Sequence, residues 1–245
     1  MKGCDMNLFG DEYIKFSNSY LTNDRSEDEC NKMLEIIKDI EIESILDLGC
    51  GNGRISFELA KRGFQVTGID WNRIALDEAK DKASAFDVSI DFQQGNILNM
   101  NFNSRFNCIV SWYTSYGYFN EAENDQVLCN IYNALTPGGV FLVDLPNRDS
   151  VLHNFQKYLV EKQNNNFMID ERTYNALDGF LYQNRTFIIN GKAKSVNFKI
   201  RLFTYTELEM KLKNAGFQTI CGHDESNSKF SINSHRMIIT ARKPL

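Results

Sequence analysis

The chain has 245 residues, 42% of them hydrophobic and 24% charged, and this composition excludes a mainly disordered protein. Its net charge of −5 argues against a protein whose main task is to bind duplex DNA or bulk RNA, because neutralising phosphates needs a basic surplus. The six cysteines are scattered without a CxxC pair, which indicates reduced thiols rather than a disulfide framework or a zinc site.

No segment of the sequence reads as a targeting or membrane signal. The N-terminal residues contain no apolar stretch long enough for a signal peptide, and no later run approaches the length of a membrane span. We therefore expect a cytoplasmic protein with neither a membrane nor a nucleic acid as partner. The length suits one domain over residues 1–245.

From the N-terminus to residue 145 the predicted elements alternate between helix and strand. Residues 1–43 are predicted to form a helical lid, in which Ser26 and Glu29 make a capping box ahead of an apolar helical stripe. The strands that follow are Ser44–Leu48, Gln65–Ile69, Val88–Phe92, Phe106–Trp112 and Val140–Leu145, and the helices are Gly53–Arg62, Asn72–Ala85 and Glu121–Leu135. This alternation predicts an α/β fold in which helices cover both faces of a parallel sheet.

After Pro146 the pattern changes, and residues 146–203 are predicted to be a small antiparallel β insertion within the domain. Asp178-Gly179 and Asn190-Gly191 separate three strand-like segments, which are Phe167–Tyr174, Phe180–Ile189 and Ser195–Phe203. An Asn-Gly pair between two β-rich runs is a strong hairpin signal. We expect this insertion either to cover an acceptor pocket or to pair with a second subunit in a homodimer.

The last part of the chain returns to helix and strand. Thr204 and Glu207 form a second capping box, which indicates a helix over Leu208–Ala215. Two further strands are predicted at Phe217–Gly222 and Met237–Ala241. The sequence shows no internal repeat and no low-complexity tract.

The glycine-rich segment Asp47–Gly53, followed by Asp70, carries the most chemical information. It lies between a predicted strand and a predicted helix, so that the backbone N–H groups of the loop can approach a bound nucleotide closely. Asp70 follows about 20 residues later at the end of the second strand, where a carboxylate can accept hydrogen bonds from both hydroxyls of a ribose.

Two cofactor classes share this arrangement, and the details separate them. The dinucleotide fingerprint GxGxxG requires a third glycine where this chain has Arg54, and here the third glycine comes early, at Gly53. Asp47 would face the negative charge of a pyrophosphate unfavourably, whereas it suits a cofactor that has an amino group and no phosphate. These features favour S-adenosylmethionine over NAD(P).

At these residues the chain resembles the class I S-adenosylmethionine-dependent methyltransferases. The family's first motif matches Asp47–Gly53, its ribose-binding acid matches Asp70, and its turn after the fourth helix matches Leu135–Gly139. The resemblance covers residues 26–144, 201–217 and 234–244. It implies a Rossmann-like α/β fold with a seven-stranded, mostly parallel sheet in the order 3-2-1-4-5-7-6 and one antiparallel strand.

The resemblance also implies where the cofactor binds. We predict that S-adenosylmethionine contacts Asp47, Gly49, Cys50, Gly51, Asp70, Trp71, Asn96, Ile97 and Ser111. Trp71 would lie along the ribose and adenine edge. Asn96 replaces the acid that usually accepts from the adenine amino group, and an asparagine carbonyl can accept the same hydrogen bond.

Within the family the likeness is to small-molecule methyltransferases, including sugar amine N-methyltransferases of antibiotic biosynthesis. The β insertion before Arg201–Thr204 and the helix ending in Ala215–Phe217 carry this likeness. The aromatic run Ser111–Phe119 lacks the Asn/Asp-Pro-Pro-Tyr motif that acts on adenine or glutamine. We predict that the acceptor contacts Tyr13, Tyr113, Tyr116 and Phe119, the alternative being that these rings only pack in the core.

These features predict N-methylation of a small-molecule amine by in-line displacement. An amine needs only to arrive deprotonated, and the sequence shows no strong base or metal constellation. No catalytic residue is assigned and no metal is expected, although His153, His223 and His235 are open candidates for a base.

Three alternatives stay open at this point. The acceptor could be a hydroxylated small metabolite, which would make the protein an O-methyltransferase. The chain could also be a non-catalytic module that binds S-adenosylmethionine. The N-terminal aromatics Tyr13, Phe16 and Tyr20 could form a lid over the cofactor or belong to a helix packed on the surface.

Overall fold

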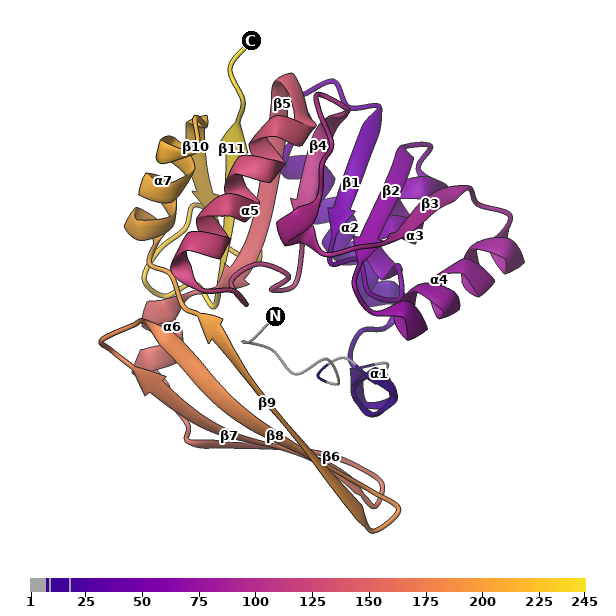
Figure 1. Ribbon diagram of the computed structural model, residues 1–245, viewed down its shortest axis with the longest axis vertical. Coiled ribbons are helices and arrows are strands. Elements are labelled where there is room, and N and C mark those ends of the chain that lie inside the picture. The colour runs from indigo at the N-terminus through magenta and orange to yellow at the C-terminus, as the bar shows by residue number, and fades with distance from the viewer. Residues whose placement is uncertain (1–7, 9, 18) are drawn as a thin grey trace.

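The computed structural model describes residues 8, 10–17 and 19–245 (Figure 1). Cys4 and the rest of residues 1–7, together with residues 9 and 18 of the predicted lid, lie outside this description. The helices are α1 (Asp11–Ser17), α2 (Asn23–Ile36), α3 (Arg54–Lys61), α4 (Arg73–Phe86), α5 (Glu121–Ala134), α6 (Arg148–His153) and α7 (Tyr205–Asn214), with a 3₁₀ turn η1 (Ile97–Asn99). Among the described residues, no helix is both long enough and apolar enough to cross a bilayer.

Every predicted strand is present, and the strands form two sheets. In chain order they are β1 (Ser44–Leu48), β2 (Gln65–Asp70), β3 (Ile90–Gln94), β4 (Phe106–Ser111), β5 (Leu135–Pro146), β6 (Tyr158–Gln163), β7 (Asn166–Asn175), β8 (Phe180–Ile189), β9 (Lys192–Arg201), β10 (Gln218–His223) and β11 (Arg236–Arg242). The seven-stranded sheet has the order β10-β11-β5-β4-β1-β2-β3. When the seven strands of this sheet are numbered 1 to 7 in chain order and read from the β3 edge, the order is 3-2-1-4-5-7-6, as predicted.

The direction of the strands also confirms the predicted α/β class. β11 is antiparallel to β5 and β10, whereas the other neighbouring strands of this sheet are parallel. Helices lie on both faces (Figure 1). Successive residues of β1 point to opposite faces, so Ile45 packs with residues of α2 and α3 and Leu46 with residues of α5, which explains the continuous apolar run.

The first helix boundary corrects one expectation. α2 begins at Asn23, because the side chain of Thr22 accepts a hydrogen bond from the backbone N–H of Arg25. Ser26 therefore lies inside the helix, where its hydroxyl donates to the carbonyl of Thr22, and the predicted Ser26–Glu29 capping box is wrong. The second predicted capping box, ahead of α7, is present.

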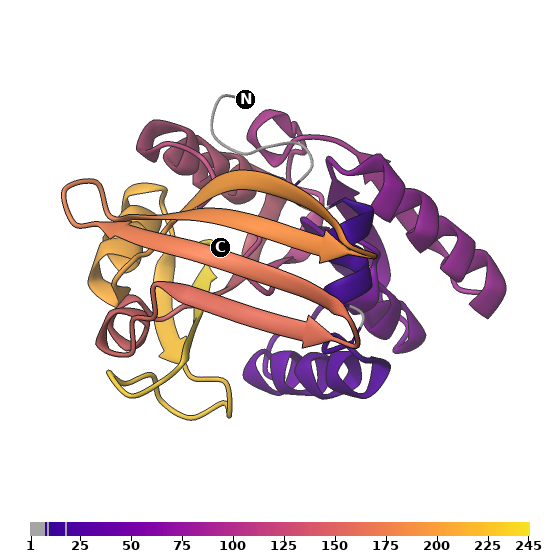
Figure 2. The ribbon, with the colours of Figure 1, turned by 90° about the horizontal axis from the view of Figure 1, so that it is seen from below.

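The four-stranded antiparallel sheet has the order β6-β7-β8-β9 and corresponds to the predicted insertion. Its β8–β9 hairpin turns at Asn190-Gly191 as expected, with Ile189 opposite Lys192. The sequence analysis missed β6, because all but one of its residues are exposed and the strand has no alternating apolar pattern. The four strands lie below the larger sheet in Figure 1, and Figure 2 shows them side by side in front of the rest of the molecule, with α1 near one end of them.

Candidate functional site

The loop after β1 depends on three glycines with positive φ. The φ angles are 69° at Gly49, 55° at Gly51 and 77° at Gly53. A Cβ atom on Gly49 would lie 2.7 Å from Cβ of Ser115, and one on Gly53 would lie 2.8 Å from the ring of Phe92. At Gly51 a Cβ would meet nothing within 4 Å. Glycine is therefore needed for the backbone at all three positions, and Gly51 leaves open space for a ligand.

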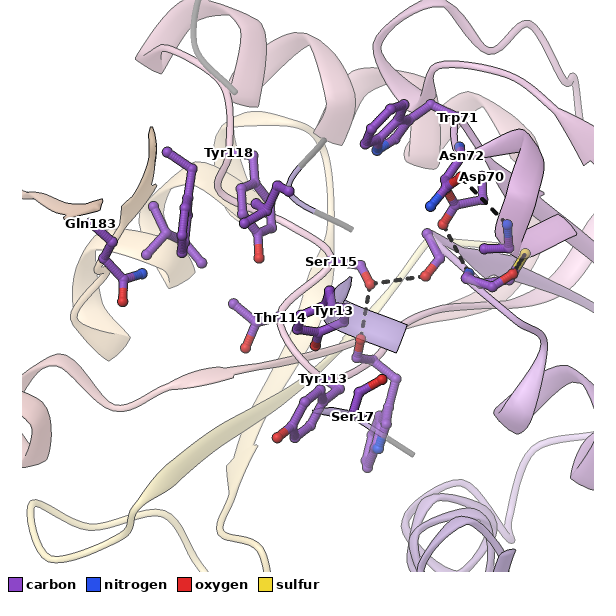
Figure 3. Close-up of a pocket in the computed structure, with 18 of the residues that line it drawn as sticks. Tyr13, Ser17, Asp70, Trp71, Asn72, Tyr113, Thr114, Ser115, Tyr118 and Gln183 are labelled. Carbon is purple, nitrogen blue, oxygen red and sulfur yellow. Dashed lines mark hydrogen bonds between the residues drawn. The ribbon is translucent and has the colours of Figure 1, made fainter. Parts of the chain in front are cut away.

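Asp70 ends β2 and is held by the same loop. Its Oδ2 accepts from the backbone N–H of Gly51 at 2.8 Å, and its Oδ1 accepts from that of Asn72 at 2.7 Å (Figure 3). Burial raises the pKa of this carboxyl group, and the hydrogen bonds from Asn72 and Gly51 oppose the shift. Each carboxylate oxygen can accept a further hydrogen bond, as the predicted ribose contact requires.

Asp47 is a second buried carboxyl group in the wall of the same cavity. Its Oδ2 accepts from the hydroxyl of Ser56 at 2.6 Å, and burial raises its pKa to about 6. Two carboxylates, Asp47 and Asp70, at one end of the cavity would repel a pyrophosphate but attract an amino group and accept from hydroxyls. Together with the open space at Gly51, this donor set fits S-adenosylmethionine.

Replacement of Asp70 by alanine is expected to weaken cofactor binding tenfold to a hundredfold, about 1.5–3 kcal/mol, since a charge-assisted contact is lost. The N–H groups of Gly51 and Asn72 lose their acceptor as well, which loosens the loop. Calorimetry with S-adenosylhomocysteine measures the effect, with Asp70→Asn as the variant that keeps one acceptor oxygen. An unchanged dissociation constant in a folded Asp70→Ala protein would remove this residue from the site.

The raised pKa of Asp47 predicts a pH dependence of cofactor affinity. Because its carboxyl group gains a proton as the pH falls through about 6, its attraction for an ammonium group is lost in the acid direction. We expect about a tenfold weaker affinity for S-adenosylhomocysteine at pH 5 than at pH 7. Calorimetry at several pH values tests this, and the same pH dependence in Asp47→Asn would show that another group is responsible.

The residues predicted for the adenine end have different placements. Trp71, Asn96 and Ile97 line the cavity. Asn96 also caps η1, its Oδ1 accepting from the backbone N–H of Leu98 at 2.9 Å, so an adenine contact through the second lone pair stays a prediction. Ser111 is only 1% exposed and does not line the cavity, so its predicted cofactor contact is wrong.

Cys50 reaches the cavity from the glycine loop and at the same time packs inward. It lines the cavity and belongs to a buried cluster with Phe57, Leu76 and Phe92. A Cβ atom on Gly68 in β2 would lie 2.9 Å from its Sγ, so the thiol occupies the space that this glycine leaves. Because the thiol packs inward, we expect Cys50 to contact the cofactor through its backbone.

The aromatic run after β4 divides between the cavity and the core. Tyr113 and Phe119 line the cavity, so their contact with the acceptor stays a prediction, and Tyr118, which the sequence analysis did not single out, lines it too. Tyr116 is 1% exposed, its ring stacks on Phe203 with centroids 5.6 Å apart, and its hydroxyl donates to a backbone carbonyl. The predicted acceptor contact of Tyr116 is therefore wrong.

The backbone of Tyr113 and Thr114 is held in an unusual conformation at the cavity wall. Their φ angles are 52° and 70°, which residues other than glycine rarely adopt. The N–H of Tyr113 donates to Oδ2 of Asp144, and Arg236 donates to the hydroxyl of Thr114, both at 3.0 Å. Arg236 in turn donates to both carboxylate oxygens of Asp144 at 2.8 Å.

Sequence reasoning missed the pairing of Asp144 with Arg236, because these residues lie on β5 and β11, far apart in the chain. The one local signal was that Asp144 is a charged residue inside an apolar strand. Buried carboxylates are usually paired, so this position could have been marked as one that needs a partner.

Glu29 was predicted as a capping residue and instead connects α2 to the site. Its carboxylate pairs with Arg25 at 2.8 Å and with Arg54 at 2.6 Å, and it accepts from the indole N–H of Trp112 at 3.0 Å. Burial alone would raise the pKa of Glu29, but Arg54 and Arg25 outweigh burial and lower it. The guanidinium carbons of both arginines lie 5.0–5.4 Å from the ring centre of Tyr113.

The N-terminal aromatics form one wall of the cavity. Tyr13 and Tyr20 line it, whereas Phe16 is buried with Met168 and Phe187 of the smaller sheet. α1 therefore fits the lid alternative better than the alternative of a helix packed on the outer surface. The three histidines, all in the described part of the chain, are not among the residues that line the cavity, which removes them as candidates for a base.

All these walls line one cavity of about 820 Å³, which is partly open to solvent. Asp70, Trp71 and Asn72 lie on one side of it and Gln183 of β8 on the opposite side, with Tyr13, Tyr113, Thr114, Ser115 and Tyr118 between them (Figure 3). The smaller sheet thus covers the carboxyl ends of the parallel strands, where ligands bind in open α/β folds.

Comparison with known sequences agrees with this geometry. Residues 45–139 match the family model described as a methyltransferase domain. The chain is 28% identical over 207 residues to the putative methyltransferase YqeM of Bacillus subtilis, covering 81% of this chain and 83% of that one. It is 38% identical over 113 residues to a putative methyltransferase of Geobacillus sp., and this match spans 46% of either chain, less than half of that relative.

Solved structures share the complete fold at low sequence identity. An S-adenosylmethionine-dependent methyltransferase from Clostridium acetobutylicum superposes with a TM-score of 0.83 at 19% identity, over 95% of this chain and 99% of that one. CalS10, an amino pentose methyltransferase from Micromonospora echinaspora, gives 0.70 at 15% identity over 94% and 95% of the two chains. At this identity the likeness concerns the fold alone.

Proposed function

We propose that this chain is an S-adenosylmethionine-dependent methyltransferase, and that it methylates a small-molecule amine held between the glycine loop and the smaller sheet. The observation that carries the proposal is the partly open cavity of about 820 Å³, which lies in the range of small-molecule sites. Its walls come from the N-terminal segment, the loops at the carboxyl ends of the parallel strands and the smaller sheet, so a compact ligand can contact all of them at once.

The two ends of the cavity have different tasks in this proposal. The cofactor, when bound, supplies a sulfonium-activated methyl group. Asp70 and Asp47 hold its ribose hydroxyls and its amino group at one end. The rings of Tyr13, Tyr113 and Tyr118 lie between the ends, where aromatic faces favour a cation and exclude water. The protein would thereby align the lone pair of the neutral amine with the S–CH₃ bond, which would break as the N–CH₃ bond forms, and the positively charged product nitrogen would then release its proton to water.

Two features support an amine as the acceptor. The hydroxyl groups of the central wall are hydrogen-bonding groups rather than strong bases, and an amine that arrives deprotonated needs no strong base. CalS10, whose fold is similar over 94% of this chain, is an amino pentose methyltransferase.

The test is transfer of a radiolabelled methyl group to a panel of matched amines and alcohols on the same sugar and aromatic scaffolds. We expect label in amines and none in their hydroxyl counterparts, and we expect Asp70→Ala to remove it. Label found only in the alcohols would make the protein an O-methyltransferase. Label found only in transfer RNA or protein would overturn the small-molecule proposal, and binding of S-adenosylhomocysteine without turnover of any acceptor would support a non-catalytic module.

A further inference from the structure

Arg172 of β7 is a charged side chain in the cavity wall that lacks a counter-charge. Its Nε is buried without a hydrogen-bond partner, and among the described residues its guanidinium group makes no ion pair. The ring of Phe155 lies 5.3 Å from its guanidinium carbon. Burial lowers the pKa of Arg172, and the charge of Asp170 only partly opposes this. A half-buried cation in this position is costly unless something supplies an anion.

The other arginines that line the cavity all have carboxylate partners. Arg54 pairs with Glu29 at 2.6 Å, Arg185 with Asp170 at 2.7 Å, and Arg236 with Asp144 at 2.8 Å. Since Asp170 is taken up by two parallel hydrogen bonds from Arg185, it does not neutralise Arg172.

The remaining carboxylate of this wall is too far away to neutralise Arg172. Glu161 of β6 lies opposite Met168 in the strand register. Met168 and Arg172 are separated by four residues along β7, which is about 13 Å in an extended strand. The wall therefore keeps an uncompensated positive charge at Arg172.

The strand register places an amide beside this arginine. Arg172 lies opposite Gln183, Gln183 lies opposite Phe198, and all three line the cavity. Figure 3 shows Gln183 on the side of the cavity away from Asp70. A planar guanidinium group and an amide N–H₂ can together bind the oxygens of one anion, with the Phe198 ring beside them.

We propose that Arg172, with Gln183 beside it, binds a carboxylate or phosphate group of the methyl acceptor. The acceptor is then an amine that also carries an oxyanion. This inference rests on the proposed function, because it assigns the ligand of Arg172 to the acceptor half of the same cavity. Placing the anion opposite Asp70 and Asp47 keeps it away from two carboxylates of the cofactor end.

The experiment measures the binding of benzoate, phenyl phosphate and neutral benzamide to the full-length protein, with and without S-adenosylhomocysteine. We expect both anions to bind at least tenfold more tightly than benzamide, and Arg172→Gln to lose at least tenfold of that affinity. Arg172→Lys keeps the charge and should retain part of it. Lys162→Gln is the matched control, because it removes the same charge from an exposed position of the same sheet outside the cavity wall.

Several outcomes would overturn the proposal. These are equal binding of benzamide and the anions, anion binding in Arg172→Gln that equals the wild type, and no binding of either anion. The anion that loses more affinity in Arg172→Gln identifies carboxylate or phosphate as the group bound. S-adenosylhomocysteine should bind Arg172→Gln as it binds the wild type, which shows that the variant is folded. If the wild type binds the anions through Arg172 but does not bind S-adenosylhomocysteine, the proposed function fails and the anion site stands.

Discussion

Replacing Asp144 by alanine is expected to destabilise the protein by about 2–4 kcal/mol, because it leaves the charge of Arg236, whose side chain is 24% exposed, without its carboxylate partner. Both carboxylate oxygens of Asp144 accept from Arg236 at 2.8 Å, and Oδ2 also accepts from the N–H of Tyr113. Urea unfolding should show a lower midpoint with an unchanged slope. Activity should fall further than stability explains, since Tyr113 and Thr114 lose the contacts that hold their positive φ angles.

Two control variants make this prediction specific. Asp144→Asn keeps an acceptor for the N–H of Tyr113 and removes only the charge, so it should be intermediate. Asp91→Ala removes a half-exposed ion pair with Arg105, at 3.4 Å, and should cost no more than about 1 kcal/mol. If Asp144→Ala costs as little as Asp91→Ala, the buried pair does not stabilise this edge of the cavity.

Replacing Tyr116 by alanine is expected to cost about 3–5 kcal/mol of folding stability, because a fully buried ring leaves a cavity in the core. Since whole domains are stable by only about 5–15 kcal/mol, thermal unfolding should detect the change easily. Tyr116→Phe keeps the stacking on Phe203 and loses only the hydroxyl hydrogen bond, worth about 1 kcal/mol.

This outcome differs from the expectation based on sequence, in which Tyr116 contacts the acceptor and its loss raises only KM. Tyr118→Ala is the informative comparison, because Tyr118 lines the cavity and its removal should raise the acceptor KM. If Tyr116→Ala unfolds at the wild-type temperature and raises only the acceptor KM, the core position of its ring is wrong.

The sequence by itself determined the fold class and the glycine loop with its two carboxylates at the cavity wall. The glycines at 49, 51 and 53, the carboxylates Asp47 and Asp70, and the Asn-Gly hairpin act through neighbours in the chain, so their spacing carries the information. Alternating helices and apolar strands likewise predict a parallel sheet, because each element must bury one face against the next. These are the parts of the prediction that the structure reproduces.

Only the tertiary structure decided which side chains face the cavity. Tyr116 and Tyr118 are equally aromatic in the sequence, but one lies in the core and the other in the cavity, since the direction of a loop residue depends on what packs against it. Asp144 meets Arg236 through the pairing of β5 with β11, which are distant in the chain. A contact between distant strands leaves no periodic pattern in the sequence. An exposed edge strand such as β6 also lacks a clear pattern, because a strand exposed to water does not need alternating apolar and polar residues.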